Sequence, residues 1–538
     1  MIEIEHVTYS YPDAESPVLS DLSLEIEEGQ FLLVIGASGS GKSTLLRCLN
    51  GLVPHFYGGS FSGSVRVAGL DPVALGPRGM SSTVGFVLQD PESQFVVDSV
   101  EDELAFAMEN HNLGPVLMRK RIEEVLDQIN IAHLRHRKIN TLSGGEKQRV
   151  AIGAVLTLQP KILVLDEPTS QLDPQAAEEV LTTLQKLNSD LGLTIVLSEH
   201  RLERVVQYAD RILYLPGQGG RPLLGSPREV LSQVDLMPPL VKLAKKLDWT
   251  PLPLTIKEGR RFARSLSLPS PADAAEPEAG GNGRGARNAL LLMEDLWFSY
   301  NGNEALKGIN LSVGPGELVA LMGRNGSGKT TLLKHIVGLI RPARGRVQLW
   351  GQDIKGTEVQ SIARKVGYVP QDPGSLLFAD TVREELEFTL RSHNLSGARY
   401  DDLLQSLQLS GLLDSYPRDL SGGERQRAAL AAILVADPAI ILLDEPTRGL
   451  DYYQKQALSQ FLSQKKAEGK AIIMSTHDVE LVASCAERVV ILGEGQIVVD
   501  GPARKVMSDS MVFSSQVNKL FGDDRLIVVE DVLRAIAQ

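Results

Sequence analysis

The sequence predicts an α/β protein in which one chain holds two domains of the same kind. Three observations lead to this prediction: a long internal repeat, apolar runs that alternate with helical patterns, and a glycine-rich phrase that occurs twice. The chain has 538 residues, more than one hydrophobic core usually organises. Two or three domains are therefore expected before any motif is considered.

The internal repeat divides the chain into two related halves. MIEIEHVTYSYPD has its counterpart in LLMEDLWFSYNGN, and TLSGGEKQRVAIGAVLTLQPKILVLDEPTSQLD has its counterpart in DLSGGERQRAALAAILVADPAIILLDEPTRGLD. Each copy covers about 230 residues, the size of a domain rather than of a solenoid repeat. We expect a first domain at 1–230 with a helical extension at 231–269, and a second domain at 289–510 with a C-terminal extension at 511–538. The Pro-, Ala- and Gly-rich segment 270–288 is expected to be a flexible linker.

Within each half, the apolar runs predict the type of sheet. FLLVIG, ILVLDE and TIVLSEH are apolar throughout and are each followed by a helical pattern, which is typical of buried parallel strands. The opening IEIEHVTYSY alternates polar and apolar residues, which indicates a half-exposed antiparallel strand. Each domain is therefore expected to have a parallel core sheet and an added antiparallel β subdomain.

Composition excludes several other classes of protein. The net charge of −12 argues against a nucleic-acid partner. Cys48 and Cys485 lie far apart, so we expect two small buried side chains in a reducing cytosol rather than a disulfide framework or a zinc site. No signal peptide is visible, and no apolar run approaches the ~18 residues that a membrane span needs. The chain is not expected to cross a bilayer, although it could lie against a protein that does.

The repeated glycine-rich phrase reads GASGSGKST in the first half and GRNGSGKTT in the second. Each copy stands between a predicted strand and a predicted helix, which is the context of a P-loop, G-x-x-x-x-G-K-[ST]. Such a loop directs backbone N–H groups and a helix N-terminus at phosphate oxygens. Lys42 and Lys329 are expected at the β and γ phosphates, and Ser43 and Thr330 on Mg²⁺. The predicted phosphate-binding residues are Gly36, Ala37, Ser38, Gly39, Ser40, Gly41, Lys42, Ser43 and Thr44, and then Gly323, Arg324, Asn325, Gly326, Ser327, Gly328, Lys329, Thr330 and Thr331.

Two acids follow at the end of one apolar strand in each half, in ILVLDEP and IILLDEP. Asp166 and Asp444 suit contact with Mg²⁺ through water, and Glu167 and Glu445 suit the polarisation of an attacking water. A lone Asp-Glu pair is usually just solvated charge. Its position in a chain with two P-loops makes a catalytic role the better interpretation.

Further polar positions recur in the same order. His200 and His477 end apolar strands 33 and 32 residues after those glutamates and are expected at the γ-phosphate. Gln89 and Gln371, in VLQDP and VPQDP, lie between the P-loop and the acids and are expected to take part in catalysis and to contact Mg²⁺. LSGGE opens a helix in each half, which predicts a second anion-binding helix start. Its residues are Ser143, Gly144 and Gly145 in the first half, and Ser421, Gly422 and Gly423 in the second.

Taken in this order, these phrases resemble the ATP-binding-cassette (ABC) ATPases over nearly the whole chain, and LSGGE is highly specific to that family. The resemblance implies two P-loop ATPase domains, each with a helical subdomain that bears the LSGGE signature. It also implies that the two cassettes pair head to tail, with each ATP between the P-loop of one and the signature of the other. Tyr11 and Tyr300 would stack on adenine, and Asp173 and Asp451 would fall at the loop that communicates between the sites.

A narrower resemblance concerns the importers of the energy-coupling-factor type in their form with fused cassettes. GLVPHFYGGSFSGSVRVAG, QDPESQFVVDSVEDELAFAMEN and SEHRLERV are similar to the ATPases of that group. The resemblance implies uptake of a vitamin or a metal ion at the cytoplasmic face of the membrane. The partners would be a transmembrane coupling protein and a membrane-embedded substrate-binding protein. Gln171 and Glu199 depart from the usual pattern, which reflects either local packing variation or two unequal ATP sites.

Two other functions remain as alternatives. A soluble tandem-cassette translation factor acting on the ribosome has similar length, but it typically joins its cassettes with a long, charged, helical linker, whereas the linker here is short and glycine-rich. A fused sugar-importer ATPase commonly has one degraded site, whereas both motif sets are intact here. The zinc cysteines or long coiled coil of a DNA-repair cassette ATPase are not seen. The sequence does not identify a transported solute.

Overall fold

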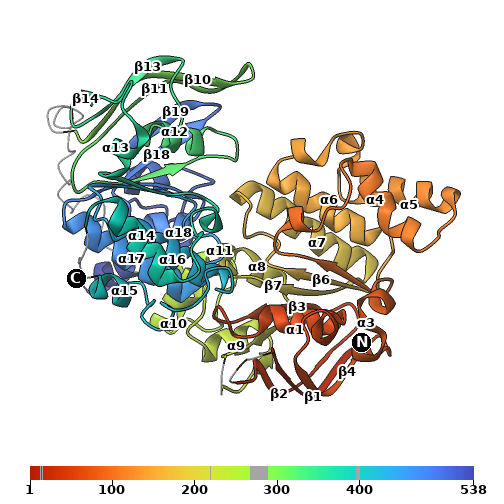
Figure 1. The fold of residues 1–538 in the computed structure, drawn as a ribbon. Helices are drawn as coiled ribbons and strands as arrows, with labels where there is room; N and C mark the ends of the chain where they lie inside the picture. The colour runs from red at the N-terminus through yellow and green to blue at the C-terminus, as the bar shows by residue number, and fades with distance from the viewer. Residues whose placement is uncertain (13, 15, 218–219, 267–288, 396–399, 538) are drawn as a thin grey trace. The chain divides into compact units, whose positions relative to one another are not determined.

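The structure is a computed structural model that describes residues 1–12, 14, 16–217, 220–266, 289–395 and 400–537. It consists of two compact units, unit 1 (Met1–Thr255) and unit 2 (Ile256–Gln538) (Figure 1). The boundary between them falls inside the predicted helical extension 231–269. The predicted linker 270–288 lies outside the described residues.

Unit 1 is built on a six-stranded sheet with the order β5-β6-β7-β3-β8-β9. The first five strands are parallel and β9 is antiparallel. The strands are β3 (Phe31–Ile35), β5 (Val84–Val87), β6 (Ile162–Asp166), β7 (Thr194–Ser198), β8 (Arg211–Tyr214) and β9 (Leu223–Gly225). Every residue of β3, β6 and β7 is buried, which confirms the prediction of core strands covered on both faces.

A second, antiparallel sheet of unit 1 has the order β2-β1-β4, formed by β1 (Ile2–Ser10), β2 (Leu19–Ile26) and β4 (Ser60–Val67). Buried and more exposed residues largely alternate along β2, as expected for a sheet with one face on the core. The helices of unit 1 are α1 (Lys42–Leu49), α2 (Leu52–His55), α3 (Pro72–Met80), α4 (Val100–Asn110), α5 (Pro115–Gln128), α6 (Gly144–Leu156), α7 (Pro174–Leu191), α8 (Leu202–Val205), α9 (Pro227–Gln233) and α10 (Pro239–Lys246). Helices α4, α5 and α6 pack on one another as a helical subdomain (Figure 1).

Unit 2 repeats this plan. Its six-stranded sheet has the order β15-β16-β17-β12-β18-β19, and its antiparallel sheet has the order β11-β10-β13-β14. The strands are β10 (Leu291–Tyr300), β11 (Asn303–Val313), β12 (Leu318–Met322), β13 (Arg344–Leu349), β14 (Gln352–Asp353), β15 (Val366–Val369), β16 (Ile440–Asp444), β17 (Ala471–Ser475), β18 (Arg488–Gly493) and β19 (Gln496–Pro502). The helices are α11 (Ile256–Ala263), α12 (Lys329–Ile336), α13 (Val359–Ala363), α14 (Val382–Ser392), α15 (Asp401–Ser406), α16 (Gly422–Leu434), α17 (Tyr452–Ala467), α18 (Val479–Cys485), α19 (Ala503–Ser508), α20 (Gln516–Phe521) and α21 (Val529–Ala537).

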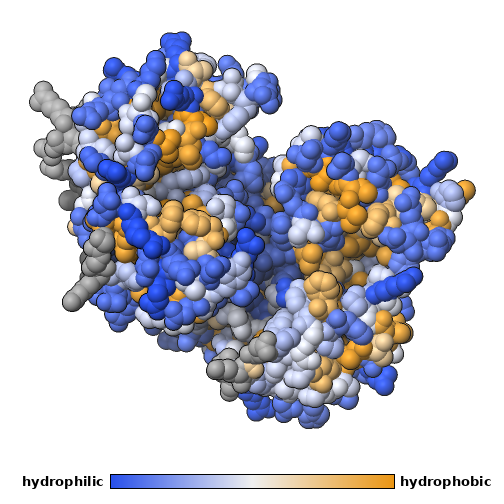
Figure 2. All heavy atoms as spheres, in the orientation of Figure 1, coloured by the Kyte–Doolittle hydropathy of each residue, from blue (hydrophilic) through white to orange (hydrophobic). Residues whose placement is uncertain are grey.

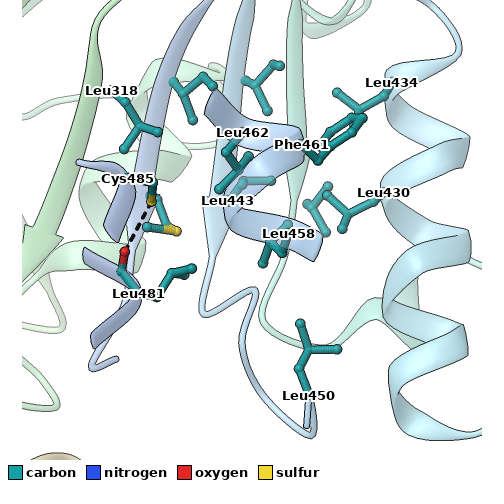
Figure 3. Packing of buried hydrophobic residues seen from close by; sticks show 14 of the residues in the cluster. Leu318, Leu430, Leu434, Leu443, Leu450, Leu458, Phe461, Leu462, Leu481 and Cys485 are labelled. Carbon is teal, nitrogen blue, oxygen red and sulfur yellow. Dashed lines mark hydrogen bonds between the residues drawn. The ribbon is translucent and has the colours of Figure 1, made fainter. Parts of the chain in front are cut away.

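The core of unit 2 holds the end of β16, the strand that is followed by Glu445 and ends at Asp444. Figure 3 shows Phe461 and Leu462 of α17 packed toward Leu430 of α16 and Leu443 of β16, all of them buried. Each such side chain contributes about 1.5–3 kcal/mol through burial. Because Asp444 directly follows Leu443, this packing sets the position of the acids at the end of β16.

Two sequence features concern the chain as a whole. Cys48 and Cys485 are buried free thiols, as predicted. None of the helices in the described ranges has the length and apolar character that a membrane crossing needs.

Candidate functional site

The P-loop of each unit joins a buried strand to a helix, β3 to α1 in unit 1 and β12 to α12 in unit 2. Gly41 and Gly328 precede the helices in the left-handed conformation, with φ of 94° and 105°. A Cβ at Gly41 would lie 3.0 Å from the carbonyl oxygen of Val18, and one at Gly328 would lie 2.7 Å from that of Ala305. Both the backbone conformation and the space require glycine. The predicted strand–turn–helix context is confirmed in both units.

The loop lysines are buried and held against their own loops. Lys42 Nζ donates hydrogen bonds of 2.9 Å to the carbonyl oxygens of Gly36 and Ala37. Lys329 Nζ donates to those of Gly323 and Arg324, at 2.8 and 3.1 Å. Each unit therefore places a cation beside the N-terminus of a helix. A cation and converging N–H groups are the two features that bind phosphate oxygens.

The predicted metal-binding pairs come together in both units. Burial raises the pKa of Asp166, helped by the negative charge of Glu167 and opposed by hydrogen bonds from Ser198 and Ser43. Burial also raises the pKa of Asp444, opposed by the neighbouring hydroxyl of Thr330 and the positive charge of Lys329. A hydroxyl beside a buried carboxylate is a donor set of oxygens that fits Mg²⁺, and a bound cation would favour the charged carboxylate.

The predicted catalytic glutamate and histidine meet in each unit. Glu167 Oε1 lies 2.8 Å from His200 Nε2, and Glu445 Oε1 lies 3.1 Å from His477 Nε2. All four side chains are at most 14% exposed. His477 Nε2 also lies 2.8 Å from Asn325 Oδ1 in the P-loop, which links the histidine to the phosphate-binding loop.

The two glutamines are placed differently. Gln89 Nε2 donates a 2.8 Å hydrogen bond to Glu167 Oε2, so the first unit joins the glutamine, the glutamate and the histidine. In the described part of unit 2, no side-chain hydrogen bond joins Gln371 to Glu445. The glutamine, the glutamate and the histidine are thus joined in the first unit, and the glutamate and the histidine in the second.

Both glutamates that are predicted to be catalytic have a strained backbone. The φ angle is 47° at Glu167 and 51° at Glu445, a left-handed conformation that is uncommon for residues other than glycine. The N–H of Glu167 donates to the carbonyl oxygen of Ser198, and that of Glu445 to the carbonyl oxygen of Ser475, at 3.1 and 2.9 Å. Strain of this kind costs about 1–3 kcal/mol and is typical of functional sites.

The LSGGE segments begin α6 and α16, as predicted. Ser143 and Ser421 are the N-caps, each in a reciprocal hydrogen-bond pair with the glutamate three residues later. A Cβ at Gly145 would lie 2.7 Å from Ala176 Cβ, and one at Gly423 would lie 2.5 Å from the side chain of Gln454. Gly145 and Gly423 therefore allow their helices to pack closely against the next helix. At Gly422, by contrast, nothing lies within 4 Å of a Cβ built on the backbone.

The remaining predicted residues take these positions. Tyr11 is half-buried and its hydroxyl lies 3.1 Å from Thr44 Oγ1 on the P-loop helix. Tyr300 is 45% exposed, and its ring makes a T-shaped contact with that of Phe298 at 4.7 Å. Asp173 and Asp451 are the N-caps of α7 and α17.

Sequence reasoning missed two buried carboxylates that hold the loop after the glutamine. Glu103 Oε2 accepts hydrogen bonds from the N–H groups of Val96 and Val97 at 3.0 and 3.1 Å. In unit 2, Glu385 accepts them in the same way from Phe378 and Ala379. The signal was present in the sequence, since both glutamates follow the loop glutamine by 14 positions.

The departure at Glu199 has a structural basis. Its carboxylate is buried and accepts hydrogen bonds from the N–H and the hydroxyl of Thr169, at 2.9 and 2.5 Å. Thr476 occupies the corresponding position in unit 2, with its hydroxyl 3.4 Å from that of Thr447. Gln171 is half-buried and corresponds to Gly449 in the second LD-containing loop.

Comparison with known proteins identifies the family. The family model described as ABC transporter matches residues 19–170 and 306–448. A protein of Streptomyces avermitilis named as an ABC transporter ATP-binding protein is 46% identical, over 100% of both chains. One of Methanosarcina acetivorans with the same name is 39% identical, over 94% of this chain and 86% of that protein.

Solved structures show the same fold. The archaeal ribosome recycling factor aABCE1, in complex with the ribosomal stalk protein aP1, has a TM-score of 0.60 at 24% identity, over 94% of this chain and 91% of that chain. The ribosome-bound archaeal Pelota and ABCE1 model gives 0.62 at 23% identity, over 93% and 79%. Given the family match and the identity to its relatives, the chain belongs to the ABC transporter family of ATP-binding, ATP-hydrolysing proteins, in a form with two ATPase domains in one chain.

Proposed function

We propose that this chain is the motor subunit of an importer of the energy-coupling-factor type. ATP binding and hydrolysis at two head-to-tail sites would drive uptake of a vitamin or a metal ion through a transmembrane coupling protein and a membrane-embedded substrate-binding protein. The motor would act at the cytoplasmic face of the membrane. The two complete sets of site residues support the ATPase part of this proposal, and an exposed aromatic pair supports the partner.

In the proposed reaction, the P-loop N–H groups and Lys42 or Lys329 hold the β and γ phosphates. Glu167 or Glu445 orients the attacking water and His200 or His477 contacts the γ-phosphate. Mg²⁺, held by Ser43, Asp166 and Gln89 or by Thr330, Asp444 and Gln371, would neutralise charge that develops on the phosphate oxygens. Tyr11 and Tyr300 would stack on adenine.

The aromatic pair lies next to the glutamine loop of unit 2. Phe378 and Phe388 are 64% and 47% exposed, and their rings lie 4.8 Å apart. Glu385 accepts a hydrogen bond from the N–H of Phe378, which holds the backbone that bears this exposed ring. Figure 2 shows hydrophobic surface in the region of α14, the helix that bears Phe388. Fixed apolar side chains in solvent are typical of a partner-binding surface.

The counterpart in unit 1 has the same construction with a smaller side chain. Val96 holds the position of Phe378, is 61% exposed, and is fixed through its N–H by Glu103. Each unit therefore presents an apolar side chain seven residues after the glutamine that is expected to contact the nucleotide site. A partner bound there would be sensitive to movement of this loop.

The test is co-purification from detergent-solubilised membranes with the membrane proteins encoded beside this chain. Phe378→Ser with Phe388→Ser is expected to reduce recovery of the partner at least about tenfold while basal ATP hydrolysis stays near the wild-type rate. A matched control replaces two exposed apolar residues elsewhere, Val116→Ser and Leu191→Ser. Equal recovery in both double variants, or partner-independent sedimentation with ribosomes at high salt, would contradict the proposal, and the second result would favour the translation-factor alternative.

A further inference from the structure

A basic pocket lies in unit 2 between α11 and the segment around α20, away from the P-loop residues. Its volume is about 760 Å³, within the range of small-molecule sites. Five of the residues that line it are cationic: Lys257, Arg260, Arg261, Arg264 and Lys519. None of its lining residues is acidic, in a protein whose net charge is −12.

The cations are concentrated by the helix rather than scattered. Lys257, Arg260, Arg261 and Arg264 follow the spacing of one helix face, and all four are exposed. Like charges at this spacing destabilise a helix by a few tenths of a kcal/mol per pair unless an anion is near. Within the described ranges, no ion pair joins Lys257, Arg261, Arg264 or Lys519 to a carboxylate. The charges of this face are therefore directed at the pocket and the solvent.

The pocket is built on fixed contacts between distant segments. The guanidinium of Arg260 donates hydrogen bonds of 2.8 and 3.2 Å to the carbonyl oxygen of Lys519, which joins α11 to α20. Under the cations, Ser514 and Asn518 are buried and linked at 2.7 Å, and Asn518 also donates to Ser508 Oγ at 3.2 Å. The polar part of the lining thus consists of hydroxyl, amide and cationic groups, and Ile256 and the exposed Met511 are its apolar members.

Guanidinium and ammonium groups with nearby hydroxyls are the groups that bind phosphate in proteins. We propose that this pocket binds a compact phosphate-bearing anion and is a third anion site, separate from the two P-loops. A ligand of this kind would contact both α11 and the α20 segment, and so would strengthen the attachment of α11 to the C-terminal part of unit 2. The same chemistry is offered by a soluble polyphosphate and by the headgroup of an anionic phospholipid.

The first arm of the test measures binding of inorganic tripolyphosphate by calorimetry in a Lys42→Ala, Lys329→Ala background of the full chain, which weakens the P-loops. Arg261→Glu with Arg264→Glu is expected to weaken binding at least about tenfold and to lower the salt dependence of the affinity, because fewer cations release counterions. The control, Arg119→Glu with Lys355→Glu, makes the same change of charge at exposed positions elsewhere and should leave binding within about twofold. Arg261→Gln with Arg264→Gln, which only removes charge, should give an intermediate loss.

The second arm distinguishes the two sources of phosphate. Flotation of the wild-type chain with phosphatidylglycerol vesicles, but not with phosphatidylcholine vesicles, together with loss in the Arg261→Glu, Arg264→Glu variant, would assign the site to a lipid headgroup. Saturable tripolyphosphate binding without flotation would assign it to a soluble anion. The inference is overturned if neither probe binds, or if the pocket and control variants lose binding equally. Thermal melting of each variant checks that it is folded.

Discussion

Glu199 and Thr169 form a buried hydrogen-bonded pair between the segments that bear Glu167 and His200 in unit 1. The carboxylate of Glu199 accepts from the N–H and the hydroxyl of Thr169, and also from the N–H of His200 at 3.1 Å. Thr169 stands two residues after Glu167, so this one carboxylate holds both segments that bear the glutamate–histidine pair. In unit 2, Thr476 takes this place, with its hydroxyl 3.4 Å from that of Thr447 and accepting a hydrogen bond from the N–H of Asp478, so the two units differ at this position.

Replacement of Glu199 is expected to affect the site that contains Glu167. In a Glu445→Gln background, Glu199→Val leaves the N–H and hydroxyl of Thr169 buried without an acceptor, at a cost of about 1–3 kcal/mol. We expect phosphate release to fall about tenfold. Glu199→Gln keeps an acceptor toward Thr169 and should stay within about threefold of its parent. The matched change Thr476→Val in a Glu167→Gln background should have the smaller effect, and a larger effect there would contradict this view of the pair.

The same carboxylate predicts a pH dependence of stability. Burial raises the pKa of Glu199 above its ordinary value, helped by the negative charge of Glu167 and opposed by hydrogen bonds from Thr169 and by the positive charge of Arg204. A carboxyl group with a raised pKa binds its proton more tightly when folded, so its contribution to stability falls as the pH rises above about 4.5. Glu199→Gln removes this titration. Urea titrations at several pH values give the free energy of unfolding of the Glu199→Gln variant and of the wild type. The value for the variant minus the value for the wild type should increase from pH 5 to pH 8. A difference that does not change with pH would refute the prediction.

Removal of both loop lysines tests the phosphate sites. Lys42→Ala with Lys329→Ala removes the lysine at the first position of each P-loop helix, α1 and α12. Loss of a preorganised electrostatic contact typically costs about 100-fold in rate or more, so we expect ATP turnover to fall at least about 100-fold. Lys355→Ala, at an exposed position, is the control. Phosphate release at near-wild-type rate by the double variant would show that hydrolysis takes place elsewhere.

Head-to-tail pairing predicts which double variants retain activity. Gly422→Asp fits sterically, since nothing lies within 4 Å of a Cβ there, but it adds a negative charge where the signature helix would meet a γ-phosphate. Paired with Glu445→Gln it should disable both sites and leave almost no hydrolysis. Paired with Glu167→Gln it should disable one site twice and leave activity at the other. The reverse ranking in a phosphate-release assay would mean that each signature serves its own unit.

The sequence predicts those parts of the site that depend on local pattern. The P-loops, the Asp-Glu pairs and the signature N-caps are contiguous phrases whose chemistry follows from their own residues, and both copies have them. Glu103 and Glu385 were missed because their role depends on backbone N–H groups six or seven residues away in an irregular loop. The packing of α11 against α20 joins segments on either side of the linker, about 250 residues apart, so no local period indicates it.

The close approach at Gly145 has a mechanical consequence. With only 2.7 Å between a Cβ at this position and Ala176 Cβ, the first turn of α6 and the first turn of α7 are in contact and cannot slide past each other without separating. The signature at Ser143 and the Asp173 cap at the start of α7 are therefore parts of one rigid body in unit 1. A tilt of the signature helix α6 in unit 1 is therefore passed on to the start of α7, and so to the segment that follows Glu167.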